Sequence, residues 1–485
     1  MLEFVDNVVM QFKGCFSRKA TFHWFVVVVI GGLLRMDSFG VTSVIRDLNL
    51  NPTFYTSLLG YFRSSAWRMD LFVNRWVDVV LKSGNCKKIN GRCILIGDGV
   101  KQNKEGLKMP GVKKHVQESG NSGKPKYIFG HLFGVVGILA GNFAKMFCIP
   151  LSAGIQDGVD QIRKFADQGA EAVSHVVQVM RQAGSIAKRT GIAYLLLDAY
   201  FLSKPALCEA EALIDDSGKH LMQVVTRAKS SAIAYQVPPP YSGRGRPPKK
   251  GDRIKLKTLF ASHKHEFTKA KAGIYGKKRD VMYYSVDLLW GAKLYKKLRF
   301  VLVCYEDTQI ILVSTCLETT PLQIIELYSY RFKIECGFRS LKQTVRGFSY
   351  HFWCQSMHKL NQFNRKKNTD AMDAIKDKDD QKRIVRTLQA TEAYVSVSLI
   401  SLGLLQMLSL NYSDEINKKS YRWLRTVRNR VVSEETVAGY FRHDIDCILA
   451  DRSDLNIVKI IKSKQAQEKH HTKEKYISVG NYLHM

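Results

Sequence analysis

The order of apolar segments between residues 91 and 228 is the feature that most restricts the fold of this chain. "RCILIGDG" is a short apolar strand that ends at Asp98, and "YIFGHLFGVVGILA" and "FAKMFCIPL" flank a hairpin turn at Gly141–Asn142. A helical stretch from about Asp157 to Lys188 follows, then a strand, "IAYLLLDAY", that carries Asp198. A short helix near Pro205–Leu213 and a strand, "LMQVVTRA", complete the region. The order βββαβαβ predicts a mixed α/β unit that still lacks a final helix.

A helix that could complete this unit appears only after about ninety further residues, in "TPLQIIELYSYRFKIECGFRSLKQTVRG". The intervening residues 229–319 open with "VPPPYSGRGRPPKKGDRIKLK" and continue as β-rich runs such as "RFVLVCY" and "QIILVST". Unstructured loops rarely reach this length inside a compact unit, so a β-rich inserted subdomain is predicted. The predicted organisation is a helical region at 1–90, a core in two parts at 91–228 and 320–415, and a helical region at 416–485.

The charge of the chain predicts a polyanionic partner. Lys and Arg number 74 against 43 Asp and Glu, a net charge of +31. Nucleic acid is the usual partner of such an excess, and it is favoured over an anionic membrane surface because no basic amphipathic helix stands out. The apolar runs Phe25–Leu34 and Val397–Leu410 are too short to span a bilayer, so both are predicted to be buried and no membrane partner is expected. The ten cysteines show no C-x-x-C pairing, which fits a reducing, cytoplasmic location.

The predicted helix at 320–347 places one carboxylate inside a basic stripe. Thr320 with Gln323 forms a capping box, Pro321 takes the first helical position, and Gly347 can close the far end. At 100° per residue, one arc of about 80° is polar and a separate arc of about 60° is apolar. The polar arc holds Tyr328, Arg331, Glu335, Arg339 and Lys342; the apolar arc holds Leu327, Ile334, Phe338, Leu341 and Val345. From Tyr328 to Gln343 the only acid is Glu335, and such a basic stretch with a single acid is suited to a strongly negative ligand, with the acid reserved for another task.

The spacing of four of these residues, Y-x2-R-x3-E-x6-K, resembles the signature of DDE transposases encoded by a large class of bacterial insertion sequences. The segments "ILIGDGVKQNKEG" around Asp98 and "YLLLDAYFL" around Asp198 are similar to the first and second catalytic regions of that family. The resemblance covers roughly residues 20–440. It implies an RNase H-like core of topology βββαβαβα, interrupted by a β-rich insertion before the last helix, which carries the catalytic Glu.

The resemblance implies that Asp98, Asp198 and Glu335 are the catalytic metal ligands. Three carboxylates at one place repel one another and raise each other's pKa values unless cations are present. Hard divalent cations suit oxygen ligands, so two Mg²⁺ (or Mn²⁺) ions are expected in the active site. Tyr328, Arg331 and Lys342 are then expected to hold DNA phosphates beside the metals, and Arg339 lies on the same stripe.

Several further DNA contacts are predicted on shorter patterns. Arg244 and Arg246 lie in "RGRP", the core of an AT-hook, which places Arg side chains in a narrow minor groove. Trp290 could stack on an extruded base, as an insertion-domain Trp does in some relatives, although a core position is at least as common. Lys101 and Lys104 follow Asp98 closely enough to touch phosphate. The two helices predicted around the turn Asn49–Pro52 could bind DNA, but most helix pairs serve as scaffolding.

The function implied is cut-and-paste transposition. The protein would bind the inverted ends of its element, cleave DNA beside them and join the 3′-hydroxyls to target DNA, as a homodimer in a synaptic complex and associated with the nucleoid. Two alternatives remain: an RNase H-like nuclease or resolvase without strand transfer, and a non-catalytic DNA-binding protein derived from a transposase. The Tyr–Arg–Lys trio argues against the first, and the intact acids argue against the second.

Overall fold

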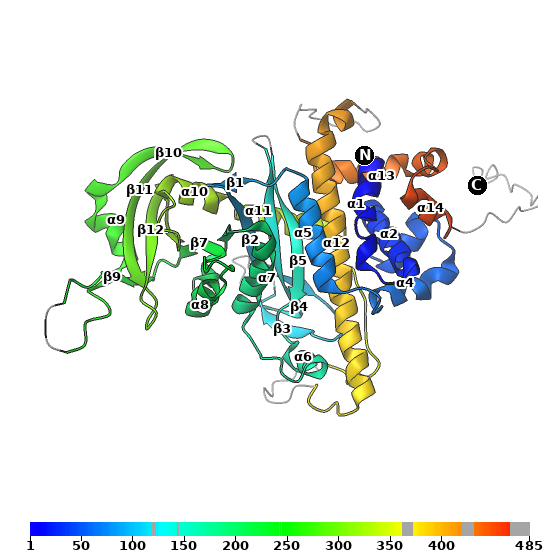
Figure 1. The fold of residues 1–485 in the computed structure, drawn as a ribbon, viewed down its shortest axis with the longest axis horizontal. Coiled ribbons are helices and arrows are strands. Elements are labelled where there is room, and N and C mark those ends of the chain that lie inside the picture. Colours follow the sequence, from blue (N-terminus) through cyan, green and yellow to red (C-terminus); the bar gives the residue numbers. More distant parts are fainter. Residues whose placement is uncertain are drawn as a thin grey trace, which may run out of the picture.

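The protein has a mixed α/β fold built on one large, mostly antiparallel sheet (Figure 1). The computed structural model describes residues 1–117, 123, 125–142, 145–241, 243, 245–360, 372–418 and 431–465. Within these ranges thirteen strands join in one sheet, with the main order β3-β4-β2-β6-β7-β13-β12-β11-β8-β9. The strands of the insertion lie at one end of the molecule, the terminal helices at the other, and the strands that carry the two aspartates lie between them (Figure 1).

The middle of the sheet contains two kinds of strand pairing. β2 (Arg92–Asn103) pairs antiparallel with β4 (Tyr127–Gly141), and β4 pairs antiparallel with β5 (Met146–Ile155), which confirms the predicted hairpin. On its other side β2 pairs in parallel with β6 (Ala193–Leu196), which pairs in parallel with β7 (Met222–Ala228). The short strands β1 (Lys88–Ile89) and β3 (Lys113–Val116) pair with β2 and β4.

Two predicted boundaries in this part of the chain are wrong. β2 does not end at Asp98, because β4 pairs with it as far as Asn103. The helix predicted from Asp157 to Lys188 is two helices, α6 (Asp160–Ala166) and α7 (His175–Thr190), with Ser174 capping the second. The short helix α8 (Lys204–Ala212) lies where it was predicted.

Alternate residues of the central strands face helices on opposite sides of the sheet. Ile94, Ile96, Tyr194 and Leu196 are buried in a cluster with α10 (Pro321–Ser329) and the start of α11 (Phe332–Gln343). Cys93, Leu95 and Leu195 belong to a second cluster that contains the apolar face of α7. Because side chains alternate along a strand, the helix that carries Glu335 covers one defined face of the sheet.

The β-rich insertion continues the central sheet. Its last strand, β13, pairs antiparallel with β7, and its own apolar cluster includes Leu256, Leu298 and Phe300. The insertion contains strands β8 to β13 and one α-helix: β8 (Ile233–Tyr235), β9 (Arg253–Lys255), α9 (Leu259–Ser262), β10 (Thr268–Ile274), β11 (Lys277–Trp290), β12 (Lys296–Tyr305) and β13 (Thr308–Ser314). The prediction of β-rich structure here is confirmed.

Helices from the two ends of the chain pack around the long α12 (Lys378–Lys418), which is kinked at Tyr412. The chain begins with α1 (Leu2–Met10), α2 (Lys19–Leu34), α3 (Val41–Asp47), α4 (Tyr55–Phe62) and α5 (Met69–Lys82), and the described part ends with α13 (Glu434–Asp451) and α14 (Asn456–Lys462). The apolar run Val397–Leu410 lies within α12, which is long enough to cross a membrane and contains an 18-residue window that is apolar enough to do so. However, 94% of its apolar window is buried inside the protein, as in the core helix of a soluble protein.

A carboxylate and arginine cluster beside the parallel strands

Asp98 on β2 and Asp198 just after the end of the neighbouring β6 lie level with each other. In the parallel pairing of β2 with β6, Ile96 is opposite Leu196, and each aspartate follows two residues later. Both therefore share the face of Ile96 and Leu196, which is the face that α10 and α11 cover. Each carboxylate accepts a 2.7 Å hydrogen bond from the amide of the next residue, Gly99 or Ala199, and Asp198 caps the 3₁₀ helix η3 (Ala199–Phe201).

The helix predicted at 320–347 is divided into α10 and α11 at Tyr330–Arg331. Main-chain bonds there tighten to a three-residue spacing, for example from Lys333 N to Tyr330 O (2.9 Å). The capping box of Thr320 and Gln323 is confirmed. At the far end, Arg346 rather than Gly347 adopts the left-handed conformation (φ 52°), and Gly347 N donates to Leu341 O. A single helical projection from 328 to 342 is therefore wrong, because Tyr328 lies on α10 and Glu335 on α11.

The guanidinium of Arg331 connects two of the three predicted metal ligands. Its Nη1 lies 3.0 Å from Asp98 Oδ2, and its Nη2 donates to Glu335 Oε1. Arg331 is largely buried, with 15% of its side chain exposed, whereas 43% of the Glu335 side chain is exposed. Asp198 lies within electrostatic range of both Arg331 and Asp98. The structure thus gathers Asp98, Asp198 and Glu335 around one cation that the chain itself supplies.

The electrostatics of this cluster are dominated by the burial of Asp98. Burial raises the pKa of Asp98 to about 6, the Arg331 guanidinium opposes that rise, and Asp198 and Glu335 add to it. Burial lowers the pKa of Arg331, but Asp98, Tyr328 and Glu335 outweigh burial and raise it. Burial also raises the pKa of Tyr328. A buried acid whose pKa approaches neutrality and that has charged partners beside it is typical of a functional site.

The donor types in this cluster suit a hard divalent cation, but their present positions do not. The three acids come from three elements, and their carboxylate oxygens are ligands of the kind that Mg²⁺ prefers. In the part of the chain that the structure describes, no three His, Cys, Asp or Glu side chains are close enough to hold a metal ion together. Arg331 lies between two of the acids, so metal binding requires its guanidinium to leave.

Lys342 and Lys101 extend the basic surface along β2 from the acids. Lys342 Nζ lies 3.3 Å from the main-chain oxygen of Lys101, so the end of α11 contacts β2 beyond Asp98. Lys101 Nζ donates to Val116 O, and both lysines and Arg339 are exposed or partly exposed. These three side chains therefore lie where a phosphate could contact them.

Lys104 differs from the prediction, because the structure buries its ammonium group. Only 8% of the residue is exposed, and Nζ donates to Phe348 O (2.6 Å) and Tyr350 O (2.9 Å) above the Tyr350 ring. Burial lowers its pKa to about 8. The polar atoms of Lys104 therefore hold the segment after α11 against the end of β2.

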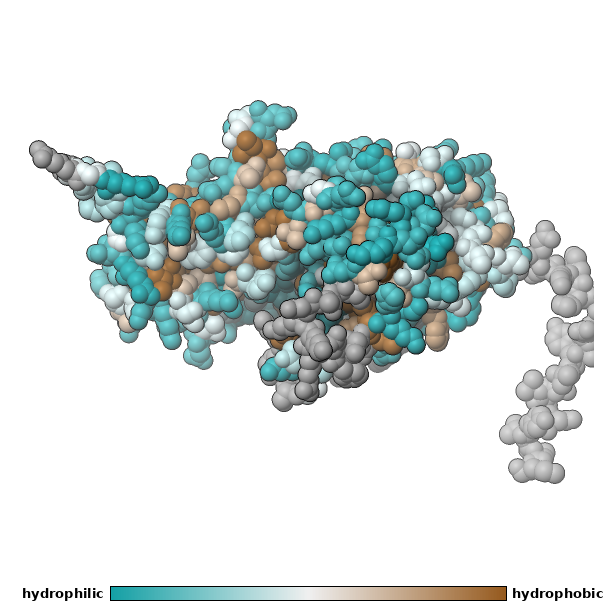
Figure 2. Space-filling view, turned by 90° about the horizontal axis from the view of Figure 1, so that it is seen from below, coloured by the Kyte–Doolittle hydropathy of each residue, from teal (hydrophilic) through white to brown (hydrophobic). Residues whose placement is uncertain are grey.

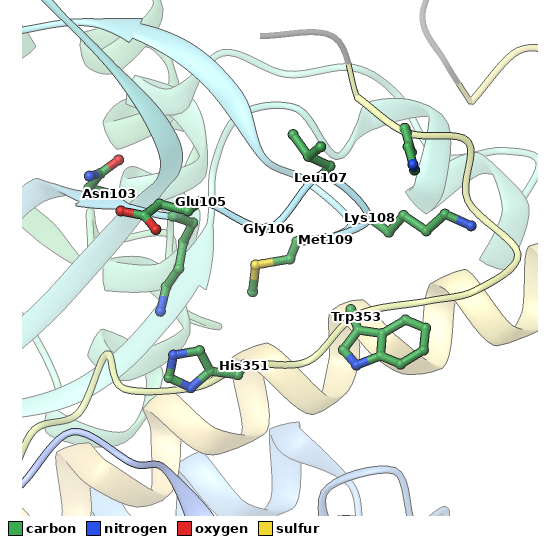
Figure 3. Close-up of a pocket in the computed structure, with 10 residues that line it drawn as sticks. Asn103, Glu105, Gly106, Leu107, Lys108, Met109, His351 and Trp353 are labelled. Carbon is green, nitrogen blue, oxygen red and sulfur yellow. The ribbon is translucent and has the colours of Figure 1, made fainter.

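A cleft of about 630 Å³ lies beside Lys104 (Figure 3). Figure 3 shows Asn103 to Met109 on one side and His351 and Trp353 on the other. Trp353 is 59% exposed, and it was not predicted from the sequence because nothing in its spacing separates it from a core Trp. Lys108 Nζ donates to Gln355 O across this region, which ties the two walls together.

Trp290 and the AT-hook-like loop are distant from the acids in the register of the sheet. Trp290 pairs with Lys296, near the start of β12. The residue of β12 that lies level with Arg227 of β7 is Val301, which pairs with Leu312 of β13. Arg227 marks the level of the acids, because it is aligned with the position just beyond the end of β6. Trp290 packs partly buried against the cluster of the insertion. Arg246 is exposed on the loop between β8 and β9, which projects as a hydrophilic finger (Figure 2). Arg244 lies outside the described residues.

Arg227 is a basic residue of this site that sequence reasoning missed. Leu196 of β6 is opposite Val225 of β7, so Arg227 is level with Asp198 and on the same face of the sheet. It is exposed and lies within electrostatic range of Tyr328. The parallel pairing was the only signal that could have identified it, because "LMQVVTRA" otherwise reads as an ordinary buried strand.

Comparison of the chain with protein-family models, with curated proteins and with solved structures found no match.

Proposed function

We propose that this chain is a DDE-type DNA transposase with an RNase H-like core. The observation that carries the proposal is the cluster of Asp98, Asp198 and Glu335 around Arg331. If the short β3 and α6 are treated as additions, the order β2, β4, β5, α7, β6, α8, β7 and then α10–α11 supports it, because it follows the βββαβαβα topology that the resemblance implies. The net charge of +31 supports a DNA substrate.

In this proposal Asp98, Asp198 and Glu335 hold two Mg²⁺ or Mn²⁺ ions. When bound, such ions activate a water or a 3′-hydroxyl and stabilise the leaving oxygen. Arg331 and Tyr328 hold the phosphate next to the acids, and Lys342 and Lys101 hold phosphates further along β2. Arg227 adds a cation level with Asp198. The remaining task of the protein is to align the phosphate with its nucleophile.

The DNA on both sides of the reading frame provides the test substrate. A duplex from each border would be incubated with the protein and Mg²⁺, and both cleavage and joining to a second plasmid would be measured. We expect Asp198→Asn to reduce both by at least about 10²-fold, since one stabilising group at the reacting centre is lost. Cleavage by Asp198→Asn at the rate of the parent would disprove the proposal. Cleavage without joining by the parent would favour a nuclease.

A further inference from the structure

The contact of Arg331 with Asp98 and Glu335 competes directly with metal binding. The guanidinium occupies one oxygen of each carboxylate, and both partners are predicted metal ligands. A guanidinium has five donors and no acceptor, and it stays charged at any pH at which the protein is folded. The guanidinium therefore cannot act as a metal ligand, and it cannot lose its charge while it stays between the two carboxylates. For a metal ion to use both carboxylates, the Arg331 side chain has to move.

A DNA phosphate is the ligand best suited to move it. Arg pairs with phosphate through two parallel hydrogen bonds, as it does with carboxylate. Arg331 lies at the tight turn between α10 and α11, with Tyr328 and Arg227 in electrostatic range of one another beside it. A phosphate seated near these residues offers the guanidinium an alternative partner at the same helix junction. The negative charge of the acids is then uncompensated and attracts a dication.

We propose that Arg331 is a placeholder for the metal ions: in the free protein its guanidinium fills the space between Asp98 and Glu335, and a DNA phosphate draws it out so that dications bind well only with DNA. This inference rests on the proposed function and adds regulation to the same site. It couples the cleavage chemistry to the presence of substrate. By linkage, metal ions must then strengthen DNA binding by the same factor by which DNA strengthens metal binding.

Mn²⁺ binding to the DNA-free protein tests this inference without a measurement of activity. The free Mn²⁺ signal in electron paramagnetic resonance gives the dissociation constant for each variant. We expect Arg331→Gln to bind Mn²⁺ about 10- to 100-fold more tightly than the parent, because a charge-assisted bridge no longer has to be broken. Arg331→Lys, which keeps the charge but loses the fork, is expected to lie between the two.

Arg339→Gln is the matched control. Arg339 lies one turn beyond Glu335 on the same helix and is exposed, and the structure gives it no contact with the three acids. Its dissociation constant for Mn²⁺ is expected to stay within about two-fold of the parent value, since an exposed charge is screened. Equal affinities for the parent and Arg331→Gln would overturn the inference, as would an equal gain in Arg339→Gln, which would indicate general electrostatics.

Two further variants separate this inference from the proposed function. Asp98→Asn and Glu335→Gln should each weaken Mn²⁺ binding in the Arg331→Gln background, and circular dichroism would verify that all variants are folded. If the two acid variants keep the full affinity, the proposed metal site is wrong. If they lose affinity while Arg331→Gln matches the parent, the metal site stands and only the placeholder role of Arg331 is wrong.

Discussion

The hydroxyl group of Thr226 donates a 2.8 Å hydrogen bond to the main-chain oxygen of Asp198. Thr226 is buried on β7, with 1% exposed, and it is the neighbour of Arg227. The bond fixes the point at which the chain leaves β6 and turns into η3, just where the Asp198 carboxylate projects. A bond from β7 to the residue that caps η3 thus helps to orient one of the three acids.

Thr226→Val keeps the shape of the side chain but leaves the Asp198 carbonyl without this donor. We expect it to lower the free energy of unfolding by about 1–2 kcal/mol and to lower the cleavage rate at saturating DNA. Thr226→Ser should restore the rate, because it restores the donor. Urea unfolding and single-turnover cleavage are the measurements. A rate unchanged in Thr226→Val would show that Asp198 is positioned by other contacts.

The raised pKa of Asp98 makes stability depend on pH. Its folded pKa of about 6 lies above the value of 3.8 for a free carboxyl, so the folded state binds the proton more tightly. The stabilisation of the folded state by this proton is therefore fully present below about pH 4 and is lost as the pH rises through 6. Relative to the parent, Asp98→Asn should gain up to about 3 kcal/mol of stability between pH 4 and pH 7. A difference between the two unfolding energies that stays constant over this range would contradict this prediction.

Periodicity predicted those elements whose structure depends mainly on their own residues. The β4–β5 hairpin, β6, α8 and β7 each bury a local apolar pattern, and the capping box at Thr320 involves residues three positions apart. The extension of β2 past Asp98 was missed because it depends on pairing with β4. The break at Tyr330–Arg331 was missed because no proline or glycine marks it.

In the site, too, contacts between residues close in sequence could be predicted, whereas contacts between distant residues could not. Arg331 and Glu335 are four residues apart, so their contact follows from helical spacing. The positions of Asp98 and Asp198 follow from parallel strand pairing once both strands are identified. The burial of Lys104 could not be predicted, because its partners Phe348 and Tyr350 lie more than 240 positions away in sequence. Contacts between residues so far apart in the sequence can be identified only from the structure.

Lys101 and Lys104 should affect DNA binding in different ways. Lys101 is partly exposed on β2, whereas Lys104 Nζ is held by two main-chain oxygens in the interior. Lys101→Met should reduce the slope of log affinity against log salt by about 0.9, the value for one phosphate contact. Lys104→Met should leave the slope unchanged and lower the unfolding midpoint instead, because Phe348 O and Tyr350 O lose their donor. A reduced slope for Lys104→Met would indicate that its ammonium group leaves the interior to reach DNA.

Arg227 should contribute to the reaction although it lies outside the Y-R-E-K signature. It is level with Asp198 on the neighbouring parallel strand, exposed and on the face that carries the acids. We expect Arg227→Gln to lower the cleavage rate at saturating DNA by about ten-fold, because one cation beside the reacting phosphate is lost, and to leave Mn²⁺ affinity almost unchanged. Lys229→Gln, at an exposed position two residues later, provides the control. Equal effects of the two substitutions on the cleavage rate would mean that Arg227 adds only general positive charge to this surface.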